Sequence, residues 1–123
     1  MTKRTQEFET EVFEAIRLRH YIELLPIIQN HEIVTIKLRF RIKPIPDGFV
    51  QFYYNEINGR TSLALVAGNT RSYGHDYVHG KGWHKHIWPQ GNHDYSEEAR
   101  KSITVQDFMK NVDEIISHGG IFG

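Results

Sequence analysis

The alternation of apolar and polar residues that begins at Ile33 constrains this chain more than any other feature. From Val34 to Ile42 every second residue is apolar, and the residues between them are threonine or basic. Successive side chains of a β-strand point to opposite faces, so this pattern predicts a half-buried strand with one apolar and one basic face. Such a strand needs partner strands and a layer that covers its apolar face.

Turn signals after this strand predict three further strands. The segment Pro44 to Gly48 has the composition of a turn, and Asn58-Gly59 is the strongest short hairpin signal in the chain. Aromatic and β-branched residues fill positions 49–57, and the chain returns as a strand over 60–67. Residues 70–78 can form a fourth, short strand. We therefore expect an antiparallel four-stranded meander.

Two segments have the apolar spacing of amphipathic helices. One is residues 5–18, and the other is residues 104–116, which begins with a threonine suited to the N-cap. The apolar cluster at 24–28 could extend the first helical region, with Pro26 in a first turn or a kink. We expect Gly119-Gly120 to end the last helix.

Residues 80–96 contain the glycines, proline and asparagine typical of a loop, with at most a short extended piece inside it. The length of the chain corresponds to one domain, residues 1–123. The sequence thus predicts an α+β fold in which an antiparallel four-stranded meander has N- and C-terminal helices packed on one face.

Composition limits the chemistry that such a domain can carry. The chain has no cysteine, so a metal site would need histidine nitrogen and carboxylate oxygen. The formal net charge is zero, which removes the argument that the protein binds nucleic acid because it is basic overall. No recognisable export signal or bilayer-length apolar stretch is present, so we expect a cytoplasmic protein without membrane contact.

Histidines are concentrated in one segment, residues 75–93. Five of the eight histidines lie there, together with both tryptophans. His84 and His86 are two positions apart, so an extended backbone would point both rings to the same side. Asp76 and His79 would reach them from the end of the preceding strand. We interpret this segment as the site, because imidazole can move protons or bind a metal near neutral pH.

Two kinds of chemistry suit these residues. In one, a histidine acts as general base and another as general acid, while Asp76 orients a ring and Lys85 or Lys81 holds an anionic substrate. In the other, zinc or manganese is held by three histidines and a carboxylate, with a position open for water. The ligands would then be His79, His84, His86 and Asp76. The positive charge of Lys85 between two histidines favours the metal-free route.

The basic face of the first predicted strand partly supports an RNA target. Cations on this face could contact phosphates, and the two indoles beside the histidines could stack on bases or anchor the loop to the core. The candidate substrate-binding residues are Lys37, Arg39, Arg41, Arg71, Trp83 and Trp88. An ordinary solvated sheet face, which also keeps a strand from aggregating, would have the same composition.

The pattern Asp76-x-x-His79-Gly80, followed after a short loop by His84-Lys85-His86, resembles the TumE-type family of small bacterial proteins. Members of that family are the toxin components of toxin–antitoxin pairs. Tyr77 stands where the family often has asparagine. The resemblance implies a short cytoplasmic protein that acts on a cellular target, RNA, and is neutralised by a cognate antitoxin protein. It does not supply a reaction.

Three functions stay open at this point. The favoured one is a metal-independent endoribonuclease, in which one histidine takes the ribose 2′-hydroxyl proton and another protonates the leaving 5′-oxygen. Lys85 or Arg71 would stabilise the phosphorane. The second is a metal-dependent hydrolase or a metal-binding protein that uses zinc or manganese. The third is a non-enzymatic interaction module whose loop closes on a partner protein. A homodimer is compatible with each.

Overall fold

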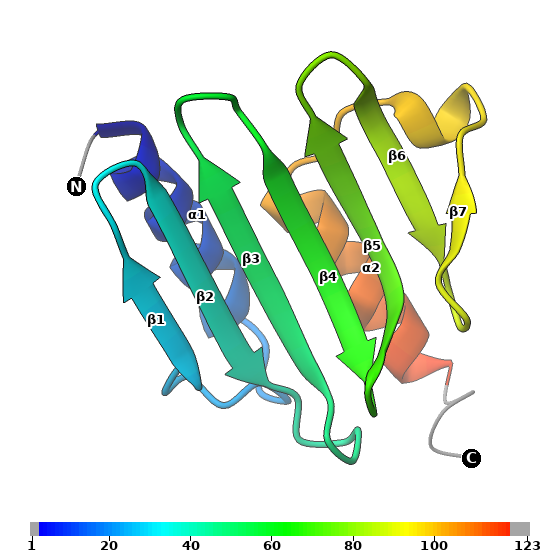
Figure 1. The fold of residues 1–123 in the computed structure, drawn as a ribbon. Helices are drawn as coiled ribbons and strands as arrows, with labels where there is room; N and C mark the ends of the chain where they lie inside the picture. Colours follow the sequence, from blue (N-terminus) through cyan, green and yellow to red (C-terminus); the bar gives the residue numbers. More distant parts are fainter. Residues whose placement is uncertain (1–2, 119–123) are drawn as a thin grey trace.

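The computed structural model describes residues 3–118 and places seven strands in one antiparallel sheet (Figure 1). The strands follow one another across the sheet in chain order. Their bounds are β1 (Ile28–His31), β2 (Thr35–Arg41), β3 (Phe49–Asn55), β4 (Thr61–Ala67), β5 (Thr70–Val78), β6 (Gly82–Ile87) and β7 (Asn92–Asp94). The helices α1 (Lys3–Arg17) and α2 (Val105–Ser117) lie behind one face, and a short 3-10 helix, η1 (Glu98–Arg100), precedes α2.

The predicted alternation in β2 is confirmed, and it defines the covered face of the sheet. Ile36, Leu38 and Phe40 are fully buried, whereas the residues between them reach solvent. The Phe40 ring meets Phe52 of β3 edge-on, with 6.3 Å between ring centroids. Phe52 in turn meets Phe108 of α2 at 5.9 Å. The apolar face of the meander therefore packs against the helical layer.

Two local signals are also confirmed. The predicted hairpin forms at Asn58-Gly59, where Gly59 has a φ of 71° and Asn58 Oδ1 accepts the Arg60 N–H at 2.9 Å, but residues 56–60 make a longer connection than the predicted tight turn. Thr104 Oγ1 accepts the backbone N–H of Asp107 at 3.0 Å, as expected of an N-cap. These turns and caps form because short-range hydrogen bonds satisfy backbone groups that the next element leaves free.

The prediction of a four-stranded meander was wrong, because the sheet has seven strands. The four predicted strands correspond to β2, β3, β4 and β5. One additional strand, β1, lies at one edge, and β6 with β7 lies at the other. The general α+β class and the placement of both helices on one face agree with the structure.

β1 begins at Ile28, the last residue of the segment that the sequence predicted as an extension of the first helical region. Leu24, Leu25 and Ile27 do not form a helix and are more than half exposed, at 53%, 84% and 55%. The chain instead runs extended beside β2, with Ile28 opposite Arg39. An edge strand is stabilised by backbone pairing on one side and needs little apolar surface. Its side chains therefore carry no strand periodicity.

β6 and β7 lie where the sequence predicted a loop. Gly80 and Gly91 have positive φ values and lie in the turns before β6 and before β7, so these glycines mark the turns between strands and not one long loop. The polar composition arises because these strands contribute their polar side chains to a solvent-facing surface. Gly119-Gly120, predicted to end the last helix, lies outside the described residues. Within residues 3–118, no helix has the length and apolar character needed to cross a membrane.

Candidate active site on the open face of the sheet

The open face, meaning the sheet face turned away from the helices, carries three histidines side by side. Directly opposed residues of an antiparallel pair share a face. Asp76 of β5 opposes His84 of β6, and His86 opposes His93 of β7. The ring centroids of the three histidines are 4.4 to 5.5 Å apart. We call His84, His86 and His93 the histidine cluster.

A β-bulge between β4 and β5 brings Arg71 to the same face. The register shifts between Leu65 and Val66, so Leu65 opposes Tyr73 whereas Val66 opposes Arg71. Without the shift, Arg71 would share the covered face with Tyr73, two residues along the strand. Arg71 instead lies on the open face, where its Nη2 donates to Ser62 Oγ at 3.0 Å.

Asp76 joins Arg71 to the histidine cluster. Its Oδ1 accepts a hydrogen bond from Arg71 Nη2. Its Oδ2 accepts one from His86 Nε2 at 3.0 Å and lies 3.4 Å from His84 Nε2. Burial by itself would raise the pKa of Asp76, but the hydrogen bonds from His86 and Arg71 and the Arg71 charge outweigh it. The pKa therefore lies well below its usual range, and Asp76 is ionised at neutral pH.

His86 is held at both ring nitrogens. Nε2 faces the Asp76 carboxylate, and Nδ1 lies 3.2 Å from the carbonyl oxygen of Gly91. Each ring nitrogen of His86 thus faces a hydrogen-bond acceptor. His86 is only 8% exposed. We therefore interpret it as a positioning residue that orients Asp76.

Gly91 allows the β6–β7 turn to close over this site. Its φ is 75°, and a Cβ at this position would lie 2.0 Å from the carbonyl oxygen of Arg71. The absence of a side chain thus permits the turn to touch the backbone of β5. This contact places the Gly91 carbonyl where it accepts from His86.

We expect Gly91→Ala to lower the free energy of unfolding by more than the roughly 1–2 kcal/mol that a left-handed backbone costs a residue with a Cβ. Gly80→Ala is the matched control, because Gly80 has a φ of 83° and its Cβ would meet no atom of the described chain within 4 Å. Urea unfolding of both variants measures the difference. Equal losses in the two variants would contradict a close approach at Gly91.

His84 and His93 are more accessible than His86. The His84 side chain is 15% exposed and its ring stacks on Tyr95, with 5.3 Å between centroids. His93 is exposed. Burial lowers the pKa of His84 from 6.5; the charge of Asp76 opposes this shift, and His86 and His93 add to it. His84 is thus neutral at pH 7, and its Nε2 is the ring nitrogen that lies 3.4 Å from Asp76 Oδ2.

The donor set at this site also fits a metal ion. One nitrogen from each member of the histidine cluster lies within 4.8 Å of the other two. Asp76 Oδ2 is 3.0 and 3.4 Å from Nε2 of His86 and His84. Ligands about 2.1 Å from a tetrahedral zinc lie about 3.4 Å apart, so these spacings are compatible. The Gly91 carbonyl at His86 Nδ1 is a common outer partner of metal-binding histidines. The Arg71 charge opposes a bound cation.

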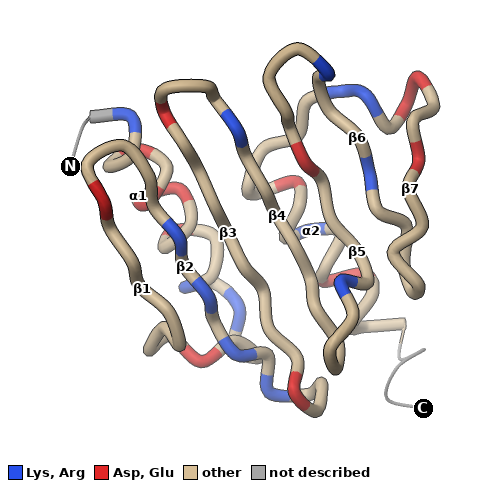
Figure 2. Tube along the Cα trace, viewed as in Figure 1, with Lys and Arg blue, Asp and Glu red and all other residues tan. Residues whose placement is uncertain are grey.

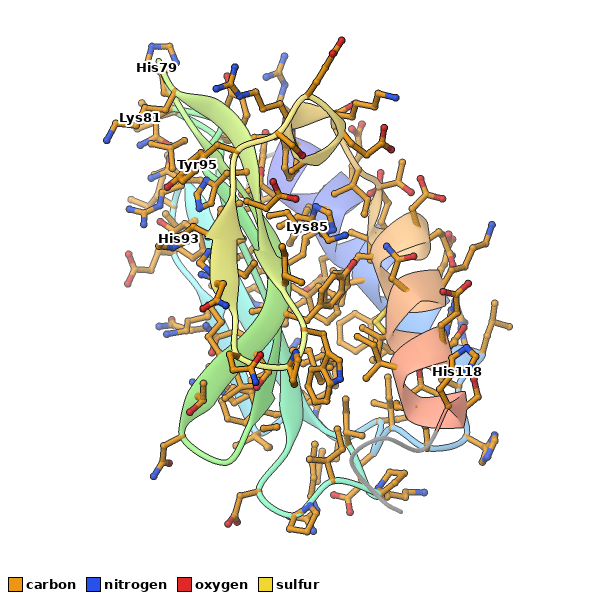
Figure 3. The ribbon with its side chains drawn as sticks, turned by 90° about the vertical axis from the view of Figure 1, so that its right-hand side faces the viewer. His79, Lys81, Lys85, His93, Tyr95 and His118 are labelled. Carbon is orange, nitrogen blue, oxygen red and sulfur yellow. The ribbon has the colours of Figure 1, made fainter. Side chains whose placement is uncertain are left out.

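The structure separates two of the predicted catalytic residues from the histidine cluster. His79 lies in the β5–β6 turn at the end of the sheet, away from His93 (Figure 3). Lys85 opposes His75 and points to the helix side, where it lines a pocket of about 400 Å³ beside α2. His93, which the predicted set lacked, lies in the cluster instead. Its strand was predicted as loop, so no periodicity marked it.

Both tryptophans lie on the helix side of the sheet. Trp83 opposes Tyr77, with 5.7 Å between ring centroids, and lines a pocket together with Phe8 of α1. Trp88, between β6 and β7, packs against the core. Of the two roles considered from the sequence, these contacts fit anchoring of the chain to the core.

The predicted basic residues lie along β2 (Figure 2), and the burial alternation of this strand places their side chains on the open face. Arg39 donates to Gln51 Oε1 through Nε and Nη2 at 2.9 and 2.6 Å, and its guanidinium lies 4.0 Å from the Phe49 ring centroid. Arg41 Nε is 3.6 Å from Glu23 Oε1, and both side chains are about half exposed. Arg39 is thus held flat on the sheet, and Arg41 is partly neutralised.

His75 belongs to a separate network on the helix side. Asn111 Nδ2 donates to Tyr73 Oη at 2.8 Å, and the Tyr73 hydroxyl donates to His75 Nε2 at 2.9 Å. Burial and the nearby Lys85 charge lower the pKa of His75 to about 4, against the opposing effect of Asp76. His75 is neutral at pH 7 and serves as a buried acceptor in the core.

No protein-family model matches this chain, and no curated protein or solved structure matches it either. The resemblance to the TumE-type family therefore stays a prediction.

Proposed function

We propose that the open-face site cleaves RNA by metal-independent general acid–base catalysis. The observation that carries this proposal is the position of a neutral His84 and an exposed His93 beside the partly buried Asp76 and its partner Arg71. A base, an acid and a cation for the phosphate are then available on one surface. Arg71 takes the phosphate role because Lys85 lies on the other side of the sheet.

In the proposed reaction, His84 Nδ1 accepts the proton of the ribose 2′-hydroxyl while the 2′-oxygen attacks phosphorus. The bond from phosphorus to the 5′-oxygen breaks, and His93 in its protonated form donates a proton to that leaving oxygen. The products are a 2′,3′-cyclic phosphate and a 5′-hydroxyl, so atoms and charges balance without a co-reactant. Arg71, whose side chain is 33% exposed, stabilises the added negative charge of the phosphorane.

Asp76 and His86 act through His84 and Arg71 in this proposal. The ionised Asp76 directs the Nε2–H of His84 and thereby leaves Nδ1 as the base. The same carboxylate holds the Arg71 guanidinium through its other oxygen. His86 and Ser62 hold this arrangement on either side. His84 and Arg71 are thus both positioned before substrate binds, which lowers the free-energy cost of orienting them.

We expect the purified protein to cleave RNA with EDTA present and to leave 2′,3′-cyclic phosphate ends. The rate should follow a bell-shaped pH profile. Because the pKa of His84 is lowered, the base stays neutral to lower pH, so the midpoint of the acidic limb should lie below 6.5. Initial rates on a fluorescent RNA together with end-group analysis measure both. RNA that stays intact in EDTA and is cleaved after zinc or manganese is added would reject the metal-free route.

A divalent-metal site is the second candidate, and the ligand spacing around Asp76 Oδ2 favours it. The histidine cluster and Asp76 would hold zinc or manganese, which would supply Lewis-acid activation of a water. Elemental analysis of protein purified without chelator tests this candidate. One ion per chain that is lost in His93→Gln would support it, because ligand loss at one position should weaken binding.

The biological role is a further proposal that rests on the resemblance of the segment from Asp76 to His86. We infer a cytoplasmic toxin-like protein that is neutralised by a cognate antitoxin. Expression of the chain alone should then slow bacterial growth, and His84→Gln should relieve that effect. Growth inhibition that persists in His84→Gln would mean that the open-face site is not responsible for toxicity.

A further inference from the structure

Two continuous rows of side chains cross the open face from β2 to the histidine cluster. The registers of neighbouring strands define both rows. The first row contains Lys37, Tyr53, Ser62, Asp76 and His84. The second row contains Arg39, Gln51, Ala64, Gly74, His86 and His93. Each row thus begins at a cation of β2 and ends at the candidate catalytic groups.

The open face is cationic although the whole chain is neutral. Among the described strand residues, it carries four cations and one carboxylate, which are Lys37, Arg39, Arg41, Arg71 and Asp76. The remaining charged strand residues, Lys85 and Asp94, oppose each other on the helix side. The strands therefore sort their charges by face, and the positive side is the side that carries the candidate site. Figure 2 shows where these charged residues lie along the strands.

The middle of the rows offers a flat surface with one aromatic platform. Tyr53 is half-buried on β3, and its row neighbour on β4 is Ser62. Ala64 and Gly74 follow in the second row and carry no bulky side chain themselves; the Arg71 guanidinium lies over Gly74, with Nη2 3.2 Å from where a Cβ would be. Four strand spacings of about 4.8 Å, or about 19 Å in all, separate β2 from β6.

We infer that the substrate is single-stranded RNA laid across the strands along these two rows. Lys37 and Arg39 contact phosphates at one end, one base stacks on Tyr53, and the scissile phosphate reaches Arg71 and His84 at the other end. This inference rests on the proposed function, because that function places the reacting phosphate. A span of about 19 Å requires several nucleotides, in line with the smallest sites, of about four nucleotides, on single-strand binding folds.

The chemistry of the rows favours a single strand over other anionic partners. A stacking platform needs an unpaired base, and a duplex keeps its bases stacked inside the helix. The surplus of cations suits a phosphate backbone. An acidic polypeptide without aromatic residues, such as polyglutamate, would satisfy the cations but has no planar group to stack on Tyr53. The role of Tyr53 therefore distinguishes RNA from an acidic protein segment.

The test measures binding of a fluorescent 2′-O-methyl RNA of about eight nucleotides, a length within known single-strand site sizes. This probe lacks the attacking hydroxyl, so binding is read without cleavage. We expect Tyr53→Ala to weaken binding about 5- to 100-fold, the usual range for a lost base stack. Lys37→Ala should lower the slope of log affinity against log salt by about 0.7, which corresponds to one phosphate contact. Lys110→Ala, an exposed cation on α2, is the matched control and should change neither value.

The inference is overturned if Tyr53→Ala and Lys37→Ala bind like Lys110→Ala, if duplex RNA binds as tightly as the single strand, or if polyglutamate competes as well as RNA. Failure of the reaction is seen separately. Binding that depends on Tyr53 and Lys37 without any RNA cleavage would support the proposed RNA-binding rows and contradict the proposed reaction. Cleavage that is unchanged in Tyr53→Ala and Lys37→Ala would support the proposed reaction and contradict the proposed RNA-binding rows.

Discussion

RNA cleavage by a His84→Gln variant is expected to fall by about 10²- to 10⁴-fold, the usual contribution of a positioned acid or base. Glutamine keeps a donor for Asp76 but cannot take up a proton at neutral pH. The His84 side chain is 15% exposed and lies on a strand surface outside the core, so the fold should persist. Initial rates at several pH values, combined with a thermal melt of each variant, measure the change.

Two further variants sharpen this test. His118→Gln alters an exposed histidine next to the end of α2 and should leave the rate unchanged. His79→Gln compares the sequence-based site with the structural one, because His79 lies in the β5–β6 turn away from the cluster. A rate for His84→Gln equal to that of His118→Gln would remove His84 from the reaction. A loss in His79→Gln as large as in His84→Gln would mean that the turn folds onto the site when substrate binds.

The protein is expected to lose about 2–3 kcal/mol of stability between about pH 7 and pH 4.5 through His75 alone. The pKa of His75 is about 4 in the folded protein and 6.5 as the ordinary value. Between these values the unfolded chain binds more protons, so stability falls as pH decreases through this window. The physical cause is that a protonated His75 would carry a buried charge and could no longer accept from the Tyr73 hydroxyl.

Urea unfolding of the wild type and His75→Gln at both pH values isolates this contribution. Glutamine can still accept from Tyr73 but does not titrate, so the variant should lose less stability on acidification. The lowered pKa of His84 acts in the same direction and remains in both proteins, so the comparison removes it. Asp76 contributes only at lower pH, because its own pKa is lowered from 3.8. Identical acid losses in the two proteins would show that His75 is not the sensitive group.

The sequence determined the central part of the fold because its signals there are local. Period-two alternation in β2 follows from burying one side of a strand against the helices. The buried residues of this alternation are Ile36, Leu38 and Phe40. The Asn58-Gly59 turn and the Thr104 cap depend on neighbouring backbone groups alone. Such features can be read without knowledge of the partner strands.

The number of strands was decided by the tertiary structure. β1, β6 and β7 occupy the edges of the sheet or the segment beside an edge, where backbone pairing supplies much of the stabilisation. Their side chains are largely polar and alternate without a clear apolar set. Composition of this kind is the same in a loop and in a strand at the edge of a sheet. The pattern therefore predicted a loop where β6 and β7 lie, and a possible extension of the first helical region up to the start of β1.

The candidate site also has one part that the sequence predicted and another part that only the tertiary structure decided. The common orientation of His84 and His86 followed from their spacing of two residues. The meeting of Asp76 with His84 depends on the β5–β6 register, Arg71 reaches the open face through a bulge, and His93 joins through β7. Registers and bulges are set by backbone pairing between segments and leave no periodic trace in the chain. For that reason the sequence identified the segment that carries the chemistry, and only the tertiary structure decided which of its side chains share a face.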